Sequence, residues 1–466
     1  MDNNKAAIIC LTMMTSTQAM DGVVDISKTA ETSWDGNRVY ENGCRSDGHR
    51  NEGKKHGKGT LTRPNGDKYV GNFVNDLMEG YGVYTYANIG VYTGEWKAGK
   101  REGRGAQRDK DGKVVYRGQW KDGKPDGQGV MKYEDGCTYE GDRKEGKKHG
   151  KGTFTWPTGD KYVGDFVNDV REGNGKHICA DGQVYHGEWK ADEKHGKGTL
   201  TWPDGGKYVG DFVNDVMEGN GRHICADGQV YHGEWKNDKR EGIGTQTDKN
   251  GKELYSGQWK DGKPDGQGVM KYEDGCVYDG NWTAGNKDGR GTFTWPTGNK
   301  YVGDFVNDVR EGYGKHICAD GQVYDGEWKA GKKHGRGTWT WPDGDKYVGD
   351  FVNDVMEGYG KHICADGQVY DGEWKAGKKH GRGTFTWPTG NKYVGDFVND
   401  VREGNGRHIC ADGQVYDGEW KNDKREGIGT QTDKNGKELY SGPWKDGKPD
   451  GRGVMKYQDG CVYDGE

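Results

Sequence analysis

The feature that most constrains this chain is a short motif that returns at an almost constant interval. The motif is Tyr-x-Gly-x-Trp/Phe or a close variant, and successive copies are 23 residues apart, except for three intervals of 24. Repetition of this kind predicts an array of small supersecondary units, each of which contacts mainly its neighbours. Ser46 takes the tyrosine place in a degenerate copy, 46–68, that precedes the others. The 18 tyrosines that begin the copies are Tyr69, Tyr92, Tyr116, Tyr139, Tyr162, Tyr185, Tyr208, Tyr231, Tyr255, Tyr278, Tyr301, Tyr324, Tyr347, Tyr370, Tyr393, Tyr416, Tyr440 and Tyr463.

Two kinds of unit alternate along much of the chain. Units like Tyr347–Val369 begin with Tyr-Val-Gly-Asp-Phe, and units like Tyr324–Lys346 begin with Tyr-Asp-Gly-Glu-Trp. Segment 241–280 also returns nearly unchanged as segment 426–465, so a block of eight repeats has been copied as a whole. Copies this similar indicate little specialisation among individual repeats.

Two segments of each unit, numbered 1 to 23 from its tyrosine, have the two-residue period of a β-strand. They are positions 1–5 and 14–18, and Pro-Asp-Gly, Pro-Thr-Gly or Ala-Asp-Gly separates the second strand from the next tyrosine. These are turn sequences. For Pro157–Gly159, a three-residue loop ending in a glycine bulge would pair Phe154 with Tyr162 and Gly152 with Gly164. We prefer this register because it puts the aromatic side chains on one face, whereas a two-residue turn would split them.

No repeat can bury such an aromatic face alone, so neighbouring repeats must stack. The sequence therefore predicts an all-β fold, an elongated, single-layer antiparallel ribbon of β-hairpins that advances about 10 Å per 23-residue repeat. Composition agrees with a thin sheet: hydrophobic residues are only 30%, whereas aromatic residues reach 11% and 86 residues are glycine. Disordered chains are poor in aromatic residues, so disorder is disfavoured for the array.

The first 45 residues are interpreted as a leader that contains a degenerate repeat remnant, and residues 46–466 as the array. The array has one degenerate copy, about 17 full repeats and a truncated last one. An apolar run over 6–14 makes residues 1–19 a candidate signal peptide. The alternative is a disordered leader, which the acidic Asp2 and the shortness of the run favour. Elsewhere no apolar stretch is long enough for a transmembrane helix.

The units resemble the MORN (membrane occupation and recognition nexus) repeat family, whose pattern is close to Y-x-G-x-W-x-x-G-K-x-H-G-x-G. Segment 370–383 agrees with it at almost every position, whereas units that begin Tyr-Val-Gly-Asp-Phe have Asn-Asp in place of Gly-Lys. The resemblance covers about residues 46–466. It implies a single-layer antiparallel sheet, roles in membrane-associated scaffolds, and self-association. Some relatives carry a kinase or methyltransferase domain beside the repeats. The leader of this chain is too short for such a domain, so none is expected.

A His-x-Cys pair recurs at positions 16 and 18, from His177 and Cys179 to His408 and Cys410. Sister repeats place Phe and Trp there, and a free cysteine packs as a small hydrophobe. One pair falls short of the four ligands of zinc, and the next pair is about 19 Å away, beyond the reach of a disulfide. We therefore expect core residues and free thiols, no metal and no cofactor. No nucleophile constellation or phosphate-binding loop stands out, so no enzyme is expected.

Positions 6–13 are expected to form a long loop whose charge alternates between neighbouring units. Lys-Lys-His makes some loops basic, and Asp-Val-Met-Glu, as in 354–357, makes others acidic. One interpretation is a solvated surface with salt bridges. The other is contact with anionic phospholipid, worth about 1 kcal/mol per basic residue, which the acidic loops would oppose. The candidate lipid-contact residues are Lys147, Lys148, His149, Lys332, Lys333, His334, Lys378, Lys379 and His380.

The sequence thus predicts a non-catalytic scaffold for protein–protein interaction or self-assembly, with a phospholipid-binding module as the alternative. A protein partner, a homodimer and an anionic phospholipid are the expected partners, and the net charge of −6 argues against nucleic acid. Expected free thiols favour the cytoplasm, at a membrane or the cytoskeleton, over secretion. The aromatic face is expected to stay partly open. Its candidate interaction residues are Tyr162, Phe166, Trp189, Trp202, Tyr324, Trp328, Trp341, Tyr370, Trp374 and Trp387.

Overall fold

The computed structural model describes residues 37–457 and 460–465, so the candidate signal peptide at 1–19 lies outside the described residues. Every regular element in the described part is a β-strand, and no helix there could cross a membrane. The chain divides into two compact units, Met1–Asp227 with Lys236–Asp238, and Gly228–Trp235 with Lys239–Glu466. The all-β, antiparallel hairpin array predicted from the sequence is confirmed.

Strands of the first unit run from the end of the leader to the seventh full repeat. They are β1 (Asn37–Val39), β2 (Arg45–Asn51), β3 (Lys54–Thr62), β4 (Lys68–Val74), β5 (Leu77–Tyr86), β6 (Gly90–Lys97), β7 (Lys100–Arg108), β8 (Val114–Lys121), β9 (Lys124–Lys132), β10 (Thr138–Lys144), β11 (Lys147–Thr155), β12 (Lys161–Val167), β13 (Val170–Ile178), β14 (Val184–Lys190), β15 (Glu193–Thr201), β16 (Lys207–Val213) and β17 (Val216–Ile224).

Strands of the second unit follow the same rhythm. The first of them, β18 (Val230–Lys236), ends on a residue that belongs to the first unit. The others are β19 (Lys239–Thr247), β20 (Glu253–Lys260), β21 (Lys263–Lys271), β22 (Val277–Thr283), β23 (Asn286–Thr294), β24 (Lys300–Val306), β25 (Val309–Ile317), β26 (Val323–Lys329), β27 (Lys332–Thr340), β28 (Lys346–Val352), β29 (Val355–Ile363), β30 (Val369–Lys375), β31 (Lys378–Thr386), β32 (Lys392–Val398), β33 (Val401–Ile409), β34 (Val415–Lys421), β35 (Lys424–Thr432), β36 (Glu438–Lys445), β37 (Lys448–Pro449), β38 (Gly453–Lys456) and β39 (Val462–Gly465).

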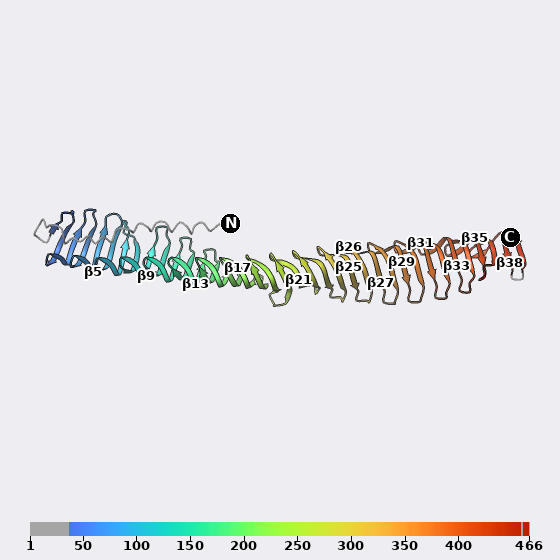
Figure 1. Cartoon of the computed structure of the whole chain (residues 1–466). Coiled ribbons are helices and arrows are strands. Elements are labelled where there is room, and N and C mark those ends of the chain that lie inside the picture. The colour runs from blue at the N-terminus through green and yellow to red at the C-terminus, as the bar shows by residue number, and fades with distance from the viewer. Residues whose placement is uncertain (1–36, 458–459, 466) are drawn as a thin grey trace. The chain divides into compact units, whose positions relative to one another are not determined.

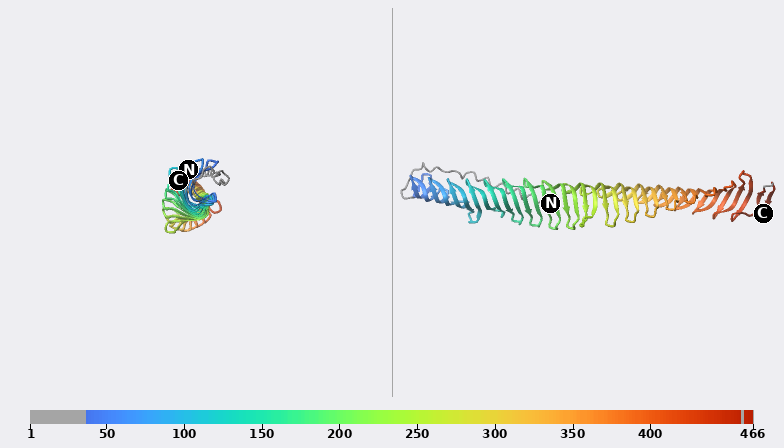
Figure 2. Two further views of the ribbon diagram at one scale, coloured as in Figure 1. Left: turned by 90° about the vertical axis from the view of Figure 1, so that its left-hand side faces the viewer. Right: turned by 90° about the horizontal axis from the view of Figure 1, so that it is seen from below.

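Within each unit, strands lie beside their neighbours in sequence and run antiparallel to them (Figure 1). Near the end of the second unit, β36 pairs with both β37 and β38. Views from two further directions show the strands of a unit as one layer (Figure 2). A unit therefore grows by one hairpin, two strands, per repeat.

The turn after each position-18 residue has the geometry predicted from its sequence. Trp156 donates its backbone N–H to the Asp160 carbonyl at 2.9 Å, and Gly159 donates to the Trp156 carbonyl at 3.1 Å. Gly159 has a φ of 97°, which a residue with a Cβ rarely adopts. Phe154 pairs with Tyr162, and Gly152 with Gly164. The prediction of register is therefore confirmed.

Positions 6–13 do not form a long loop, and that prediction was wrong. They form a second hairpin, in which Val167 ends β12, Val170 begins β13, and only Asn168 and Asp169 separate them. Both turn residues have positive φ, 51° and 77°. Two successive positive φ values make a type I′ turn, whose twist matches that of the flanking strands. Asn and Asp tolerate this conformation, as does the glycine of the Ala-Gly turns in sister repeats.

The core of each repeat is a tyrosine lying over two glycines. Tyr162 is 0% exposed, and its ring covers Gly164 on its own strand and Gly175 on the next strand. A Cβ on Gly164 would lie 2.5 Å from the tyrosine oxygen, and one on Gly175 would also collide with the ring. The phenol hydroxyl donates a hydrogen bond to the Asp165 carbonyl at 3.1 Å. The glycines are therefore required by packing, since only they leave room for the ring.

Aromatic rings also connect each repeat to the next. Tyr162 meets Phe166 of its own repeat edge to face, with ring centroids 5.1 Å apart, and Trp189 of the following repeat at 5.3 Å. Trp189 in turn donates its indole N–H to the Gly175 carbonyl at 3.2 Å. Edge-to-face pairs contribute about 0.5–1.5 kcal/mol beyond the area they bury. Repetition of these contacts makes a ladder of rings along one face of the sheet.

Candidate interaction surfaces of the repeat array

Most of the predicted aromatic interaction face is core. Each of its tyrosines covers a glycine pair, and each position-5 ring is flanked by the tyrosines of its own and the preceding repeat. None of the seven residues concerned is more than 6% exposed, so the expectation of an open furrow was wrong for them. The seven are Tyr162, Phe166, Trp189, Tyr324, Trp328, Tyr370 and Trp374.

The other three residues of that face, all at position 18, remain half-buried. Trp202, Trp341 and Trp387 lie just before the three-residue turns, at the edge of the sheet. Each packs its indole against the histidine of the next repeat, as Trp341 does against His362, with ring centroids 5.6 Å apart. Contact with an outside partner through this face is therefore restricted to its edge. That a partner binds there stays a prediction.

The nine predicted lipid-contact residues lie in strands and differ in exposure. The first lysine of each Lys-Lys-His is exposed, and the second is half-buried on the aromatic face, where Lys333 Nζ lies 3.3 Å from the Trp339 ring centroid. Burial lowers the pKa of Lys333. The histidines are half-buried, and their Nδ1 atoms are enclosed without a hydrogen-bond partner. The exposed residues are Lys147, Lys332 and Lys378, the half-buried lysines are Lys148, Lys333 and Lys379, and the histidines are His149, His334 and His380.

The two-residue turns form an edge of the sheet with a pattern that the sequence analysis missed. Lysines at positions 6 and 9 face each other across the turn in one kind of repeat, and valines do so in the other. In the second unit the order along this edge is Val306 and Val309, Lys329 and Lys332, Val352 and Val355, and Lys375 and Lys378. These valines are 40–48% exposed. The sequence signal that could have predicted this edge is Val-Asn-Asp-Val, in which two turn-forming residues separate two valines.

Acidic residues at the same edge join consecutive repeats. Asp354 Oδ1 accepts the backbone N–H of Lys333 at 2.8 Å, and Glu357 Oε2 accepts that of Ala376 at 2.8 Å. The Asp354 N–H also donates to the Lys333 carbonyl at 3.0 Å. These carboxylates satisfy backbone donors that the turns leave without a strand partner. The acidic residues that alternate with the basic ones along this edge therefore serve as hydrogen-bond acceptors between repeats.

The opposite face of the sheet carries the exposed side chains of positions 2, 4, 13 and 15. Tyr313 and Tyr359, both at position 13, are 59% and 60% exposed. Oppositely charged side chains lie beside them, for example Lys315 and Asp325, whose Nζ and Oδ2 are 3.6 Å apart. We call this surface the outer face. Its exposed aromatic residues recur because the repeats themselves recur.

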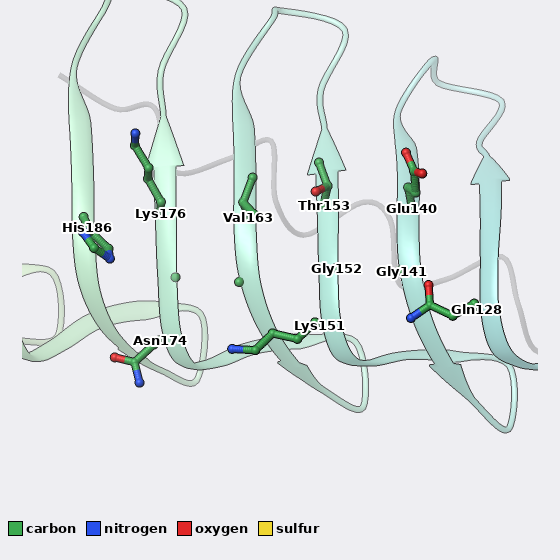
Figure 3. Close-up of a pocket in the computed structure, with 12 residues that line it drawn as sticks. Gln128, Glu140, Gly141, Lys151, Gly152, Thr153, Val163, Asn174, Lys176 and His186 are labelled. Atoms are coloured by element: carbon green, nitrogen blue, oxygen red, sulfur yellow. The ribbon is translucent and has the colours of Figure 1, made fainter.

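A shallow groove of about 520 Å³ crosses the outer face of the first unit (Figure 3). Gly152 and Gly164 lie along its floor, and Thr153, Val163 and Lys176 are among the side chains beside it. The groove follows the row of paired glycines, which carry no side chain to fill it. It is open, and its lining is mixed in charge and polarity.

The His-x-Cys residues occupy the aromatic places predicted for them. His362 pairs with Tyr347 across the strands, and its ring lies between Trp341, at 5.6 Å, and Trp374, at 6.1 Å. Cys364 Sγ lies 3.6 Å from His362 Nδ1. Burial lowers the pKa of His362 and raises that of the Cys364 thiol. Cys364 is a free cysteine, as are Cys179, Cys318 and Cys410.

Asp345 approaches the same histidine, which sequence analysis did not anticipate. Its Oδ2 lies 3.4 Å from His362 Nε2, and its Oδ1 accepts the backbone N–H of Ala365 at 2.8 Å. Asp345 belongs to the preceding repeat, so the contact joins two repeats at the edge formed by the three-residue turns. In the sequence these residues are 17 positions apart (362 − 345), and only the hairpin register brings them together.

Comparison with curated proteins finds similarity to a short part of much longer chains. Alsin from Rattus norvegicus and alsin from Homo sapiens are each 41% identical to this chain over 73 residues. The match covers 15% of this chain and only 4% of each alsin. The chain therefore spans a small fraction of the length of these relatives.

Solved structures share only a loose likeness with this chain. The SAS-4 (dCPAP) TCP domain of Drosophila melanogaster, in complex with a proline-rich motif of Ana2, is 11% identical, with a TM-score of 0.23, over 36% of this chain and 85% of that one. The TCP10 domain of Danio rerio CPAP, in complex with a STIL peptide, is 12% identical, with a TM-score of 0.14, over 68% of this chain and 98% of that one. Superpositions this poor carry no argument about function.

The family comparison, in contrast, covers nearly the whole array. The model of the MORN repeat matches 18 consecutive segments, from 51–68 to 440–462. Most of them begin at the tyrosines that cover the glycine pairs, so the family pattern and the packing unit coincide. The chain belongs to the MORN repeat family.

Proposed function

We propose that the chain is a non-catalytic scaffold that mediates protein–protein interaction or self-assembly through the outer face of its hairpins. The observation that carries this proposal is the recurrence of Tyr313 and Tyr359, each about three-fifths exposed, in equivalent surroundings two repeats apart. Exposed tyrosines supply large contact area together with a polar hydroxyl, and they are enriched at interfaces. A surface that recurs binds a repeated or dimeric partner with increased avidity.

Two further features support a scaffold over an enzyme. Near-identical repeats present the same residues many times, whereas an active site needs an asymmetric set of groups. The free cysteines, such as Cys364, are compatible with a reducing compartment, so the proposal places the protein in the cytoplasm.

The test compares the wild-type chain with the double variant Tyr313→Asn, Tyr359→Asn. Asparagine occupies this position in sister repeats, at Asn174 and Asn405, so the variant retains the fold. Light scattering of the purified chain across micromolar concentrations is expected to show a mass that rises with concentration, and affinity purification is expected to recover partners. Both effects should weaken in the variant. A monomeric mass throughout, with identical recovery by both chains, would refute the proposal.

A second candidate function, binding of anionic phospholipid, is favoured by the edge formed by the two-residue turns. Exposed valine pairs there alternate with exposed lysine pairs, such as Val352 and Val355 next to Lys375 and Lys378. Lysines attract anionic headgroups, and apolar side chains between them can enter the interface. We rank this function second because the other lysine of each Lys-Lys-His packs on aromatic rings, as Lys333 does.

Co-sedimentation with vesicles tests the lipid function directly. Vesicles containing phosphatidylserine are expected to pellet the chain at low salt and to release it at high salt, because screening weakens the attraction. Replacing Lys329, Lys332, Lys375 and Lys378 by glutamine should weaken pelleting, and neutral vesicles serve as the control. Absence of binding at low salt would remove this candidate and leave the scaffold proposal intact.

A further inference from the structure

We infer that Asp345, His362 and Cys364 form a binding site for a zinc ion that connects two successive repeats. One carboxylate oxygen, one imidazole nitrogen and the cysteine sulfur all lie within 4.8 Å of one another. Within the described residues this is the single group of three or more such side chains that converge to this extent. All three residues are half-buried, so the donors are both held in place and reachable from solvent.

The surrounding structure already orients two of the three donors. The His362 ring lies between the indoles of Trp341 and Trp374. Asp345 is fixed by its Oδ1, which accepts the Ala365 N–H, so its Oδ2 is the atom that faces His362. Side chains held in this way lose little freedom when an ion binds, which favours affinity.

The spacing and the chemistry of the donors fit zinc. Zinc binds imidazole nitrogen and carboxylate oxygen at about 2.0–2.2 Å and thiolate sulfur at about 2.3 Å, which puts tetrahedral ligands about 3.5 Å apart. His362 Nε2 lies 3.4 Å from Asp345 Oδ2, whereas Cys364 Sγ lies 3.6 Å from the other ring nitrogen, Nδ1. The three donor atoms lie within 4.8 Å of one another, so the side chains must move closer when one ion binds. Three protein ligands leave the fourth position to water. Calcium and magnesium prefer sets made of oxygen alone, so a mixed oxygen, nitrogen and sulfur set excludes them.

Most of the other His-x-Cys pairs in the chain lack the carboxylate that Asp345 supplies, so they serve as internal controls. Asn299 and Asn391 stand where Asp345 stands, before the pairs that begin at His316 and His408, and an amide is a poorer zinc ligand than a carboxylate. Gly206 precedes His223 and offers no donor.

Asp160 is the one other carboxylate at this place, and it is held differently. The Thr158 hydroxyl donates a hydrogen bond to Asp160 Oδ2 at 2.8 Å, which occupies the oxygen that would face His177. In the proposed site Asp343 takes the place of Thr158 and has no hydroxyl to donate. This difference explains why two repeats with the same Asp, His and Cys place them differently.

An ion at this position would join Asp345, just before β28, to the end of β29 in addition to the backbone pairing. Binding to the folded chain alone raises its stability in proportion to the logarithm of the zinc concentration. It also releases the thiol proton of Cys364, since the thiolate is the ligand.

The test is a zinc titration of the reduced, full-length chain against a chromophoric chelator, using zinc chloride as the probe. Asp345→Asn should bind one equivalent less than the wild type. The variant retains the fold because Asn391 accepts the Ala411 N–H at 2.7 Å in the equivalent place, and circular dichroism checks this. Cys364→Ser is a second, independent variant that should lose the same equivalent. Thr158→Asp should gain one, because it frees the Asp160 carboxylate.

Two further readouts decide the outcome. Zinc should raise the melting temperature of the wild type and leave that of Asp345→Asn unchanged. Cobalt(II) in place of zinc should give a sulfur-to-metal charge-transfer band that Cys364→Ser lacks. The inference is overturned if the wild type binds no zinc at micromolar free concentration. Equal stoichiometry in the wild type, Asp345→Asn and Cys364→Ser would overturn it as well.

Discussion

At the scale of single residues, the repeat depends on the contact between a tyrosine ring and two glycines. Tyr324, 2% exposed, lies over Gly326 and Gly337, and its hydroxyl donates to the Glu327 carbonyl at 2.8 Å. Sequence analysis predicted that glycines pair across the three-residue turn, as Gly152 and Gly164 do, because a two-residue period and a known turn fix the register there. It did not predict that Gly326 and Gly337 pair across the two-residue turn. It could not predict which ring fills the space.

We predict that Gly337→Ala destabilises the chain by about 1–3 kcal/mol, the usual result of overpacking a core. The new Cβ would lie 2.5 Å from the Tyr324 oxygen, and the ring has no free volume into which to move. Urea unfolding followed by tryptophan fluorescence measures the change. Gly206→Asn is the matched control, because Asn299 occupies that place in a sister repeat, and its stability should stay within about 0.5 kcal/mol of the wild type.

The buried tyrosines also predict loss of stability at alkaline pH. Burial raises the pKa of Tyr116, Tyr255 and Tyr416 to about 12, from an ordinary value near 10. A raised pKa means that the folded chain holds its protons longer than the unfolded chain does, so stability is complete below pH 10 and falls above it. Absorbance of tyrosinate at 295 nm should therefore rise together with the loss of the circular dichroism signal. Ionisation of all tyrosines near pH 10 without unfolding would contradict this prediction.

At the scale of elements, each repeat has two strands and two different turns, one between its own strands and one that leads to the next repeat. The three-residue turn was predicted because Pro and Gly mark it, and its glycine bulge sets the register. The two-residue turn was taken for part of a loop, since the charged residues around it have no clear two-residue period. Asn353 and Asp354, with φ of 49° and 73°, form a turn of this second kind.

We predict that Asp354→Ala destabilises the chain by about 1–2 kcal/mol, whereas Asp354→Gly has a smaller effect. Both variants lose the bond from Lys333 N–H to the carboxylate, but alanine alone is also strained at positive φ. Glycine already occupies this place at Gly331 and Gly377. In thermal unfolding, the melting temperature should be highest for the wild type, lower for Asp354→Gly and lowest for Asp354→Ala. Equal melting temperatures for the two variants would show that the positive φ at this position does not affect stability.

At the scale of the whole molecule, contacts join each repeat mainly to its neighbours. Rings, turn carboxylates and strand pairs all link consecutive repeats, as between Tyr347 and Trp374, whose centroids are 5.2 Å apart. The stability of such an array is close to a sum of repeat and neighbour contributions. The stability of the array then depends less on which repeats are present than on an unbroken succession of neighbouring repeats.

Deletion of residues 347–392, two complete units, should therefore leave a folded chain. Lys346 would then meet Tyr393, which keeps the order of turn and tyrosine. We expect an unchanged circular dichroism signal per residue and a melting temperature within a few degrees of the wild type. Deletion of 347–381, which ends inside a unit, is the control and should lower both. Equal behaviour of the two deletions would contradict the repeat as the folding unit.

The sequence by itself determined the period, the all-β class, the register at the three-residue turn and the aromatic face. These follow from local patterns: alternation, turn residues and glycine places are all read within one repeat. Only the tertiary structure decided that Tyr162 and Trp189 are buried, that Lys333 lies on a ring, and that Asp345 reaches His362. Burial and convergence depend on side chains from neighbouring strands. The pattern along one strand does not show which side chains of the neighbouring strands its residues contact.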